Sequence, residues 1–134
     1  MPENHQNFHH EISGDPDQGF AVVEVTTGNC IFPIQGAHVL ITRNTEDGTV
    51  LFASLETGPD GKTIVIPLPA PYENLAMEPY PAESPYEIYF VRIAHPGYYT
   101  EENHIIQVFG GSASFLKADM IPLPENYQQG VMTQ

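Results

Sequence analysis

The sequence predicts an all-β fold, a single antiparallel β-sandwich of about seven strands. Glycine and proline punctuate the whole chain, with 11 glycines and 13 prolines among 134 residues. The runs between them are short and rich in Val, Ile, Thr, Tyr and Phe, which favour the pleated surface of a sheet. No run sustains the hydrophobic period of an amphipathic helix, so strands alone account for the pattern.

Turn residues separate the runs that have strand character. Asp-Gly steps at 47–48 and 60–61 predict tight turns, because glycine accepts the positive φ that such turns require. We expect a positive φ at Gly97 as well, with the ring of Tyr98 packed inward after it. The expected strands are residues 19–27, 37–43, 49–56, 62–67, 86–95, 104–109 and 113–121.

Prolines and polar ends mark the limits of these elements. Pro67 has no backbone N–H and is expected to end strand pairing at that point. From Pro67 to Pro85 prolines recur so often that the segment is interpreted as an ordered extended crossover or a mobile loop. We expect it to contact a partner, and the alternative is that it caps an open edge of the sandwich. Residues 1–18 and 126–134 are predicted to be polar tails around one domain at 19–125.

The hydrophobic core is predicted from strand parity, since alternate side chains of a strand face one side of its sheet. A β-bulge that shifts the register would bring the opposite face inward. The expected core residues are Val23, Val25, Val39, Ile41, Leu51, Ile64, Ile66, Ile88, Phe90, Ile106, Val108 and Phe115.

The composition narrows the possible partners and locations. Asp and Glu outnumber Lys and Arg by 17 to 4, and this acidity would repel nucleic acid and anionic membrane surfaces. A single cysteine, Cys30, excludes an intramolecular disulfide. Residues 1–10 lack the parts of a signal peptide, and no run reaches the ~18 apolar residues of a membrane span. We therefore expect a cytoplasmic protein, and we favour a monomer.

Three short motifs approach catalytic or nucleotide-binding signatures and fail in detail. Residues 58–63 end like a phosphate-binding loop, but Glu56 stands where that motif has its first glycine. Residues 110–114 miss the nucleophile elbow, because Ser114 stands where glycine permits the sharp turn. Cys30 could pair with a histidine, yet no local signature marks an activated thiol. We predict no catalytic residue.

Metal ligands are present only in weak arrangements. His5, His9 and His10 lie in the predicted N-terminal tail, where ordering entropy opposes a stable site. Asp15 and Asp17 precede the first strand and would need loop carbonyls to complete a calcium site. We predict no metal site and no cofactor.

Several motifs occur in an order that resembles a known family. The chain resembles the carboxypeptidase-regulatory-like domain, a transthyretin-like (prealbumin-like) sandwich with Ig-like topology. The motifs that carry this resemblance are residues 21–25, 33–41, 57–63 and 96–99. More narrowly, the chain resembles a module found in the prepro regions of spore cortex-lytic enzymes from spore-forming bacteria. The motifs that carry this second resemblance are residues 66–71, 85–89, 97–99 and 120–125. Related sandwiches form Lys-Asn isopeptide bonds. The first strand here has no lysine and the last strand has no asparagine, so we do not expect such a bond in this chain.

The resemblance implies a non-catalytic accessory or interaction module, associated with spore cortex or cell-wall processing. Its partner would be a protein or a cell-wall glycan, and the alternative function is that of a peptidoglycan-binding module. A transthyretin-like small hydrolase would need clustered basic and histidine side chains, whereas Lys and Arg are scattered along this chain. Tyrosines can stack on sugars or anchor protein partners. The expected binding residues are Tyr72, Tyr80, Tyr86, Tyr98 and Tyr99.

Overall fold

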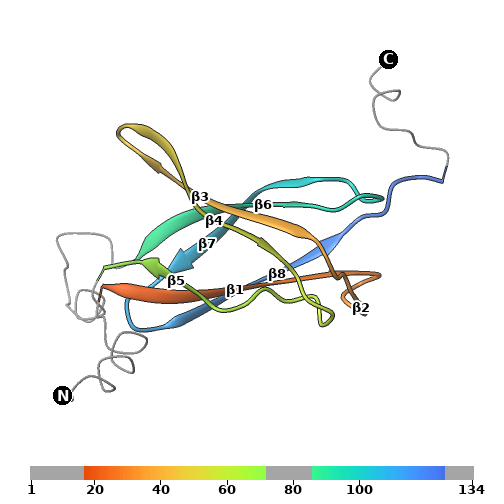
Figure 1. Ribbon diagram of the computed structural model, residues 1–134, viewed down its shortest axis with the longest axis horizontal. Coiled ribbons are helices and arrows are strands. Elements are labelled where there is room, and N and C mark those ends of the chain that lie inside the picture. The colour runs from red at the N-terminus through yellow and green to blue at the C-terminus, as the bar shows by residue number, and fades with distance from the viewer. Residues whose placement is uncertain (1–16, 72–85, 126–134) are drawn as a thin grey trace.

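The computed structural model describes residues 17–71 and 86–125. Most of the predicted N-terminal tail, the predicted C-terminal tail and most of the proline-rich crossover lie outside these ranges, and Gln18, predicted in the tail, begins the first strand. The described residues form eight strands and no helix, in two four-stranded sheets, which confirms the predicted β-sandwich (Figure 1). The strands are β1 (Gln18–Thr27), β2 (Phe32–Pro33), β3 (His38–Thr45), β4 (Gly48–Glu56), β5 (Ile66–Pro69), β6 (Glu87–Ala94), β7 (Glu101–Val108) and β8 (Ala113–Met120).

One sheet is built around β1 and is here called the β1 sheet. β8 runs parallel to β1 along one edge, from Phe20 opposite Ala113 to Thr27 opposite Met120. The other edge of β1 is shared by β5 near its start and β2 near its end, both antiparallel. The second sheet, the β3 sheet, has the order β4-β3-β6-β7 and is antiparallel throughout. The first and last described strands are therefore hydrogen-bonded neighbours.

The core lies between the two sheets and consists of their inward-facing side chains. Each large apolar side chain buried there contributes roughly 1.5–3 kcal/mol of transfer free energy. The expected core residues that the structure buries are Val23, Val25, Val39, Ile41, Ile66, Ile106 and Val108.

The face of β6 that points into the core is the opposite of the predicted one. Ile88 and Phe90 lie on the outer face, and Tyr89, Val91 and Ile93 are buried. Cross-strand partners share a face of a sheet, and the two buried aliphatic residues of β6 lie opposite buried residues of β3. Tyr89 can be buried because its hydroxyl finds a hydrogen-bond acceptor on β5, in a distant part of the chain. The alternation of residues within β6 does not reveal that acceptor, so the prediction chose the wrong face.

Three further core predictions are wrong. Leu51 is 57% exposed, because a bulge shifts the register of β3 against β4 and places it opposite Thr42. Phe115 is 75% exposed, since it lies opposite Val22 on the outer face of the β1 sheet. Ile64 is 72% exposed and precedes β5 without joining a strand.

Pro67 does not end strand pairing as predicted. The expected strand at 62–67 is replaced by β5, which begins at Ile66, and Pro67 pairs with Phe20 inside it. Among the described residues β5 pairs with β1 alone. An edge strand tolerates proline, because one side of its backbone makes no ladder hydrogen bonds.

The predicted glycine turns are confirmed. The φ angles are 116° at Gly48, 80° at Gly61 and 91° at Gly97, all in the left-handed region. After Gly97, the ring of Tyr98 packs partly against the core, as the sequence predicts.

Candidate binding site

The outer face of the β3 sheet carries apolar side chains where a sandwich commonly has polar ones. Leu40 and Phe90 are half-buried and Ile105 is 52% exposed. They alternate with buried residues of β3, β6 and β7, so strand parity places them on the outer face. Phe90 lies opposite Ile105 on one side and Thr42 on the other. An apolar strip therefore crosses three neighbouring strands.

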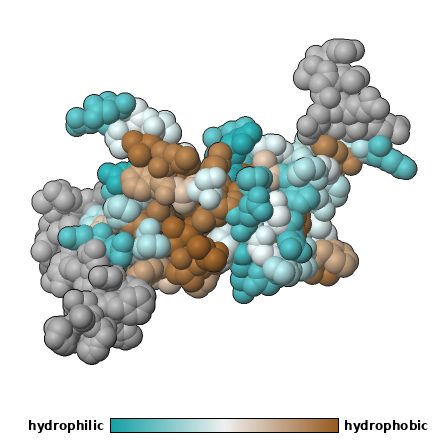
Figure 2. All heavy atoms as spheres, in the orientation of Figure 1, coloured by the Kyte–Doolittle hydropathy of each residue, from teal (hydrophilic) through white to brown (hydrophobic). Residues whose placement is uncertain are grey.

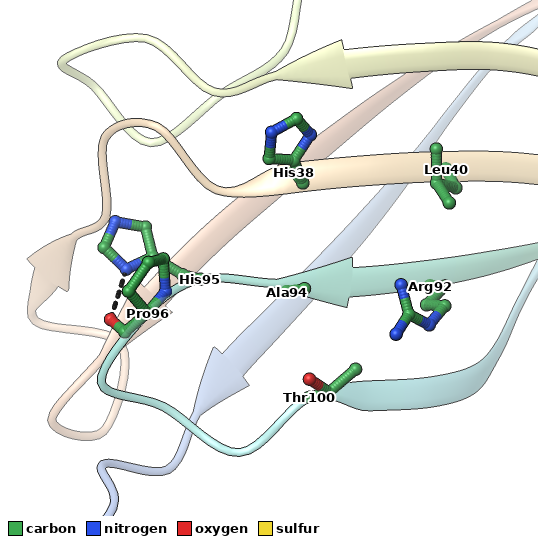
Figure 3. A pocket seen from close by; sticks show the side chains of 7 residues that line it. All are labelled: His38, Leu40, Arg92, Ala94, His95, Pro96 and Thr100. Carbon is green, nitrogen blue, oxygen red and sulfur yellow. Dashed lines mark hydrogen bonds between the residues drawn. The ribbon is translucent and has the colours of Figure 1, made fainter. Parts of the chain in front are cut away.

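Two adjoining hollows lie along this face, and together we call them the β3–β6 groove. Their volumes are about 400 Å³ and about 320 Å³, and Leu40 and Arg92 line both. The first hollow, drawn in Figure 3, is lined by His38, Leu40, Arg92, Ala94, His95, Pro96 and Thr100. The second is lined by Leu40, Thr42, Asn44, Thr49, Phe90, Val91, Arg92, Glu102 and Asn103.

Two side chains of the first hollow, His38 and Arg92, each contact a carboxylate of a flanking strand. His38 Nε2 lies 3.3 Å from Glu56 Oε2, and Arg92 Nε lies 3.5 Å from Glu102 Oε1. The four side chains are between 48% and 62% exposed, so water screens both pairs and each adds little to stability. A ligand can therefore replace either carboxylate at small cost in free energy.

His95 is fixed by backbone carbonyls at one end of the groove (Figure 3). Its Nδ1 lies 2.7 Å from the carbonyl oxygen of Pro96, and its Nε2 lies 3.1 Å from that of Gln35. A neutral imidazole carries one N–H, so it donates to one of these carbonyls at a time. The ring also meets Tyr98 edge-on, with centroids 5.5 Å apart.

A second polar cluster lies near the start of β6, and its contacts are structural. Arg43 Nε lies 3.4 Å from Glu87 Oε2, and the guanidinium carbon stands 5.8 Å from the ring centroid of Phe52. Arg43 Nε is shielded from solvent and makes no hydrogen bond, so its interaction with Glu87 is ionic. Phe52 meets Tyr89 edge-on at 5.4 Å, and the Tyr89 hydroxyl donates to the carbonyl oxygen of Pro69. These side chains thus join β3, β4, β5 and β6.

Further apolar side chains are exposed on β4 and on the segment leading into β5. Figure 2 shows apolar atoms gathered over the middle of the molecule, where β4 and the segment leading into β5 lie in Figure 1. The exposed apolar side chains of these two segments are Val50, Leu51, Ile64 and Val65, between 40% and 72% exposed. Such side chains can bury area against a protein, but they offer no hydrogen bonds with which to select a small ligand.

The predicted binding tyrosines do not share one location. Tyr72 and Tyr80 lie outside the described residues. Tyr86 is half-buried just before β6, whereas Tyr98 and Tyr99 follow its other end. A strand of eight residues spans about 26 Å, so these tyrosines lie at opposite ends of the sheet. Tyr98 borders the β3–β6 groove through its ring contact with the histidine there.

Metal-binding side chains are not gathered in the part of the chain that the structure describes. There, no group of three His, Cys, Asp or Glu side chains could hold a metal ion. Cys30 is exposed, and its backbone N–H donates to Asp119. The three described histidines contact carboxylates or backbone carbonyls rather than the thiol.

The groove itself was missed by the sequence interpretation, although one signal for it was present. Arg92 has the same strand parity as Ile88 and Phe90, and a charged residue marks the solvent side of a sheet. The interpretation grouped these three residues on one face but assigned that face to the core. The pairing of β3 with β6 then brings His38 and Leu40 beside them.

Comparisons with known proteins support the fold. No protein-family model matches the sequence, and neither does any curated protein. Among solved structures, the Bacillus anthracis TIE protein matches 80% of this chain over 17% of its own, with a TM-score of 0.55 and 15% identity. The pilus adhesin RrgA of Streptococcus pneumoniae matches 81% over 15%, with a TM-score of 0.47 and 14% identity.

The chain thus spans about a sixth of the length of each of these proteins. At 15% identity, the similarity to the TIE protein concerns the β-sandwich and not its function. The described residues contain no helix that is long and apolar enough to cross a membrane.

Proposed function

We propose that this chain is a non-catalytic binding module that uses the β3–β6 groove to hold a component of the bacterial cell wall or spore cortex. The observation that carries the proposal is the hollowed, partly apolar outer face of the β3 sheet. Apolar side chains there gain about 25 cal/mol per Å² when a ligand covers them. The sequence resemblance at residues 66–71 and 120–125 supports the cell-wall or cortex assignment.

The groove is better suited to binding than to hydrolysis. It does gather Arg92, His38 and His95, the kind of cluster that a transthyretin-like hydrolase needs. However, His38 and Arg92 are half exposed or more and the groove lies on an open sheet face, so it does not exclude water as active sites do. The ring nitrogens of His95 and His104 contact backbone carbonyls and a carboxylate, not a hydroxyl or thiol that they could activate as a nucleophile.

A protein partner is the second candidate, and the sandwich edge favours it. β4 and the segment leading into β5 expose the apolar side chains Val50, Leu51, Ile64 and Val65, and the outer edge of β4 makes no ladder bonds within the described residues. An extended segment of another protein can pair with such an edge.

Co-sedimentation with purified peptidoglycan and spore cortex tests the leading proposal. Leu40→Asp places a charge in the floor of the groove and should remove binding. Phe115→Asp is the matched control, because that side chain is exposed on the outer face of the β1 sheet, and it should bind like the parent.

Three results would contradict the proposed site or function. Loss of binding in both variants would point to a general effect of added charge. Retention of binding by Leu40→Asp would place the contact elsewhere. If the parent protein stays in the supernatant with both materials, and a pull-down from sporulating cells recovers no partner, the binding-module function itself fails.

A further inference from the structure

The first hollow of the β3–β6 groove differs in charge from the rest of the protein. The chain has 17 Asp and Glu residues against 4 Lys and Arg, yet none of the seven residues lining this hollow is acidic. Arg92 is the cation among them, and His38 and His95 add two imidazole rings. Arg92 is thus the group in this hollow that an anionic ligand can contact, and a carboxylate matches the planar donors of its guanidinium.

The position of the groove decides what kind of molecule can carry that carboxylate. It lies over β3 and β6, the two inner strands of the β3 sheet, whose backbone groups are used by ladder bonds on both sides. An extended polypeptide obtains its affinity largely from backbone pairing at a sheet edge, which this position does not offer. The ligand must be recognised by side chains alone.

The side chains present suit a saccharide. Leu40, Phe90 and Ala94 give an apolar floor on which the C–H face of a sugar ring can rest. Thr100 in the first hollow and Thr42 in the second supply hydroxyl groups that both donate and accept hydrogen bonds, as sugar hydroxyls do. The two adjoining hollows run along the strands, so a chain of sugar rings can occupy them in succession.

We infer that the β3–β6 groove binds a saccharide chain that carries carboxylate groups, with Arg92 as the contact for a carboxylate. This inference rests on the binding-module function proposed above and names its ligand class. In the free protein, Glu102 Oε1 lies 3.5 Å from Arg92 Nε. The carboxylate of the ligand therefore replaces a side-chain carboxylate of the protein at Arg92. His38 lines the same hollow and contacts Glu56.

This exchange predicts opposite effects for the two members of the ion pair. Arg92→Gln removes the charge and should weaken binding of an acidic saccharide about fivefold, as expected for a half-exposed charge-assisted contact. Glu102→Gln removes the competing carboxylate and should strengthen binding by about threefold. A general loss of structure cannot produce the second effect, so it distinguishes ligand contact from a structural role.

The test is a titration of the isotope-labelled protein with tetragalacturonate, followed through its backbone amide NMR signals. Fully methyl-esterified tetragalacturonate is the matched probe, because it keeps the sugar rings and removes the charges. Acetylated tetraglutamate amide is the peptide probe. Lys117→Gln is the control variant, since it removes a cation from the outer face of the β1 sheet.

The expected result is a set of shifts confined to β3, β6 and the start of β7, with the acid binding more tightly than the ester and Lys117→Gln behaving like the parent. Equal affinity for acid and ester, unchanged affinity in Arg92→Gln, or tighter binding of the peptide would overturn the inference. If cell-wall material still binds in a way that depends on Leu40 while tetragalacturonate does not bind, the ligand class is wrong and the proposed function stands.

Discussion

The hydroxyl of Tyr89 donates a 2.5 Å hydrogen bond to the carbonyl oxygen of Pro69, and this contact joins the β3 sheet to the β1 sheet. Tyr89 is fully buried on β6, and Pro69 is the last residue of β5. The edge-on contact with Phe52 supports the same ring from β4. One side chain therefore connects three strands at the end of the sandwich where β5 lies.

Removing the Tyr89 hydroxyl should destabilise the fold less than removing the ring. Tyr89→Phe loses one hydrogen bond and should cost about 1 kcal/mol in the free energy of unfolding. Tyr89→Ala leaves a cavity and should cost about 3–5 kcal/mol. Urea unfolding measures both. Phe115→Ala, at a side chain that is 75% exposed, is the control and should change stability by less than about 0.5 kcal/mol. Equal losses for the two Tyr89 variants would show that the ring packing contributes little.

Tyr89 should also make the protein less stable at alkaline pH. Burial is the largest cause that raises the pKa of its hydroxyl above the ordinary value of 10.0, while Arg43 acts in the opposite direction. Above that value the unfolded chain loses this proton before the folded chain does, so stability falls as the pH rises through the raised pKa. The difference between parent and Tyr89→Phe should therefore shrink between neutral pH and pH values above the ordinary pKa. Urea midpoints measured across that range check this.

The Asp119 carboxylate supports a strained turn between β1 and β2. It accepts hydrogen bonds from the backbone N–H groups of Cys30 at 2.9 Å and Asn29 at 3.1 Å, and from the Thr26 hydroxyl at 3.0 Å. Asn29 and Cys30 both have positive φ, 61° and 68°, which side chains of L-residues rarely adopt. The hydrogen bond from Cys30, first among these contacts, holds the pKa of Asp119 below its ordinary value of 3.8.

Asp119→Asn should lower the urea midpoint at pH 7, and the deficit should disappear in acid. Because the folded-state pKa is lowered, the stabilisation by the carboxylate is present above pH 3.8 and is lost as the pH falls through the lowered value. Urea midpoints of parent and variant between pH 7 and pH 2 measure this. Glu46→Gln removes a charge at an exposed hairpin position and should change the midpoint little at any pH. If the urea midpoint of Asp119→Asn stays below that of the parent by the same amount down to pH 2, the loss of stability comes from the shape of the side chain and not from its charge.

The parts of the fold that the sequence predicts are those that local chemistry decides. The Asp-Gly step at 47–48 requires a positive φ whatever surrounds it, and the hairpin forms there. Local chemistry does not decide which face of β6 points into the core, because the burial of Tyr89 depends on a hydrogen-bond acceptor on β5. Pro67 likewise ends a strand in the interior of a sheet but not at the edge where β5 lies.

The candidate site was harder to predict because strand register creates it. Leu40 and Arg92 are far apart in the sequence, and only the pairing of β3 with β6 places them opposite each other. The binding tyrosines were chosen by residue type, which carries no information about which strand end they occupy. The described ones, Tyr86, Tyr98 and Tyr99, therefore fall at opposite ends of β6.

Gly61 is the turn residue whose replacement the structure tolerates least, because it combines a positive φ with a close backbone approach. Its φ is 80°, and a Cβ atom there would lie 2.6 Å from the carbonyl oxygen of Val25 and 3.0 Å from Cβ of Pro33. Its own carbonyl accepts a 2.7 Å hydrogen bond from the Val25 N–H. The turn is thereby bonded to β1 and cannot move away without losing that bond.

Gly61→Ala should therefore destabilise the protein by about 3 kcal/mol, the upper range for one strained residue, since neither backbone neighbour can move freely. Gly58→Ala is the matched control in the same turn. A Cβ at that position would lie 3.5 Å from Asp60 Oδ1, an ordinary contact, and its φ is outside the left-handed region. Thermal unfolding of both variants measures the difference, with Gly58→Ala expected near the parent. If the two variants unfold together, the turn relaxes around the added methyl group and its bond to β1 is not a rigid constraint.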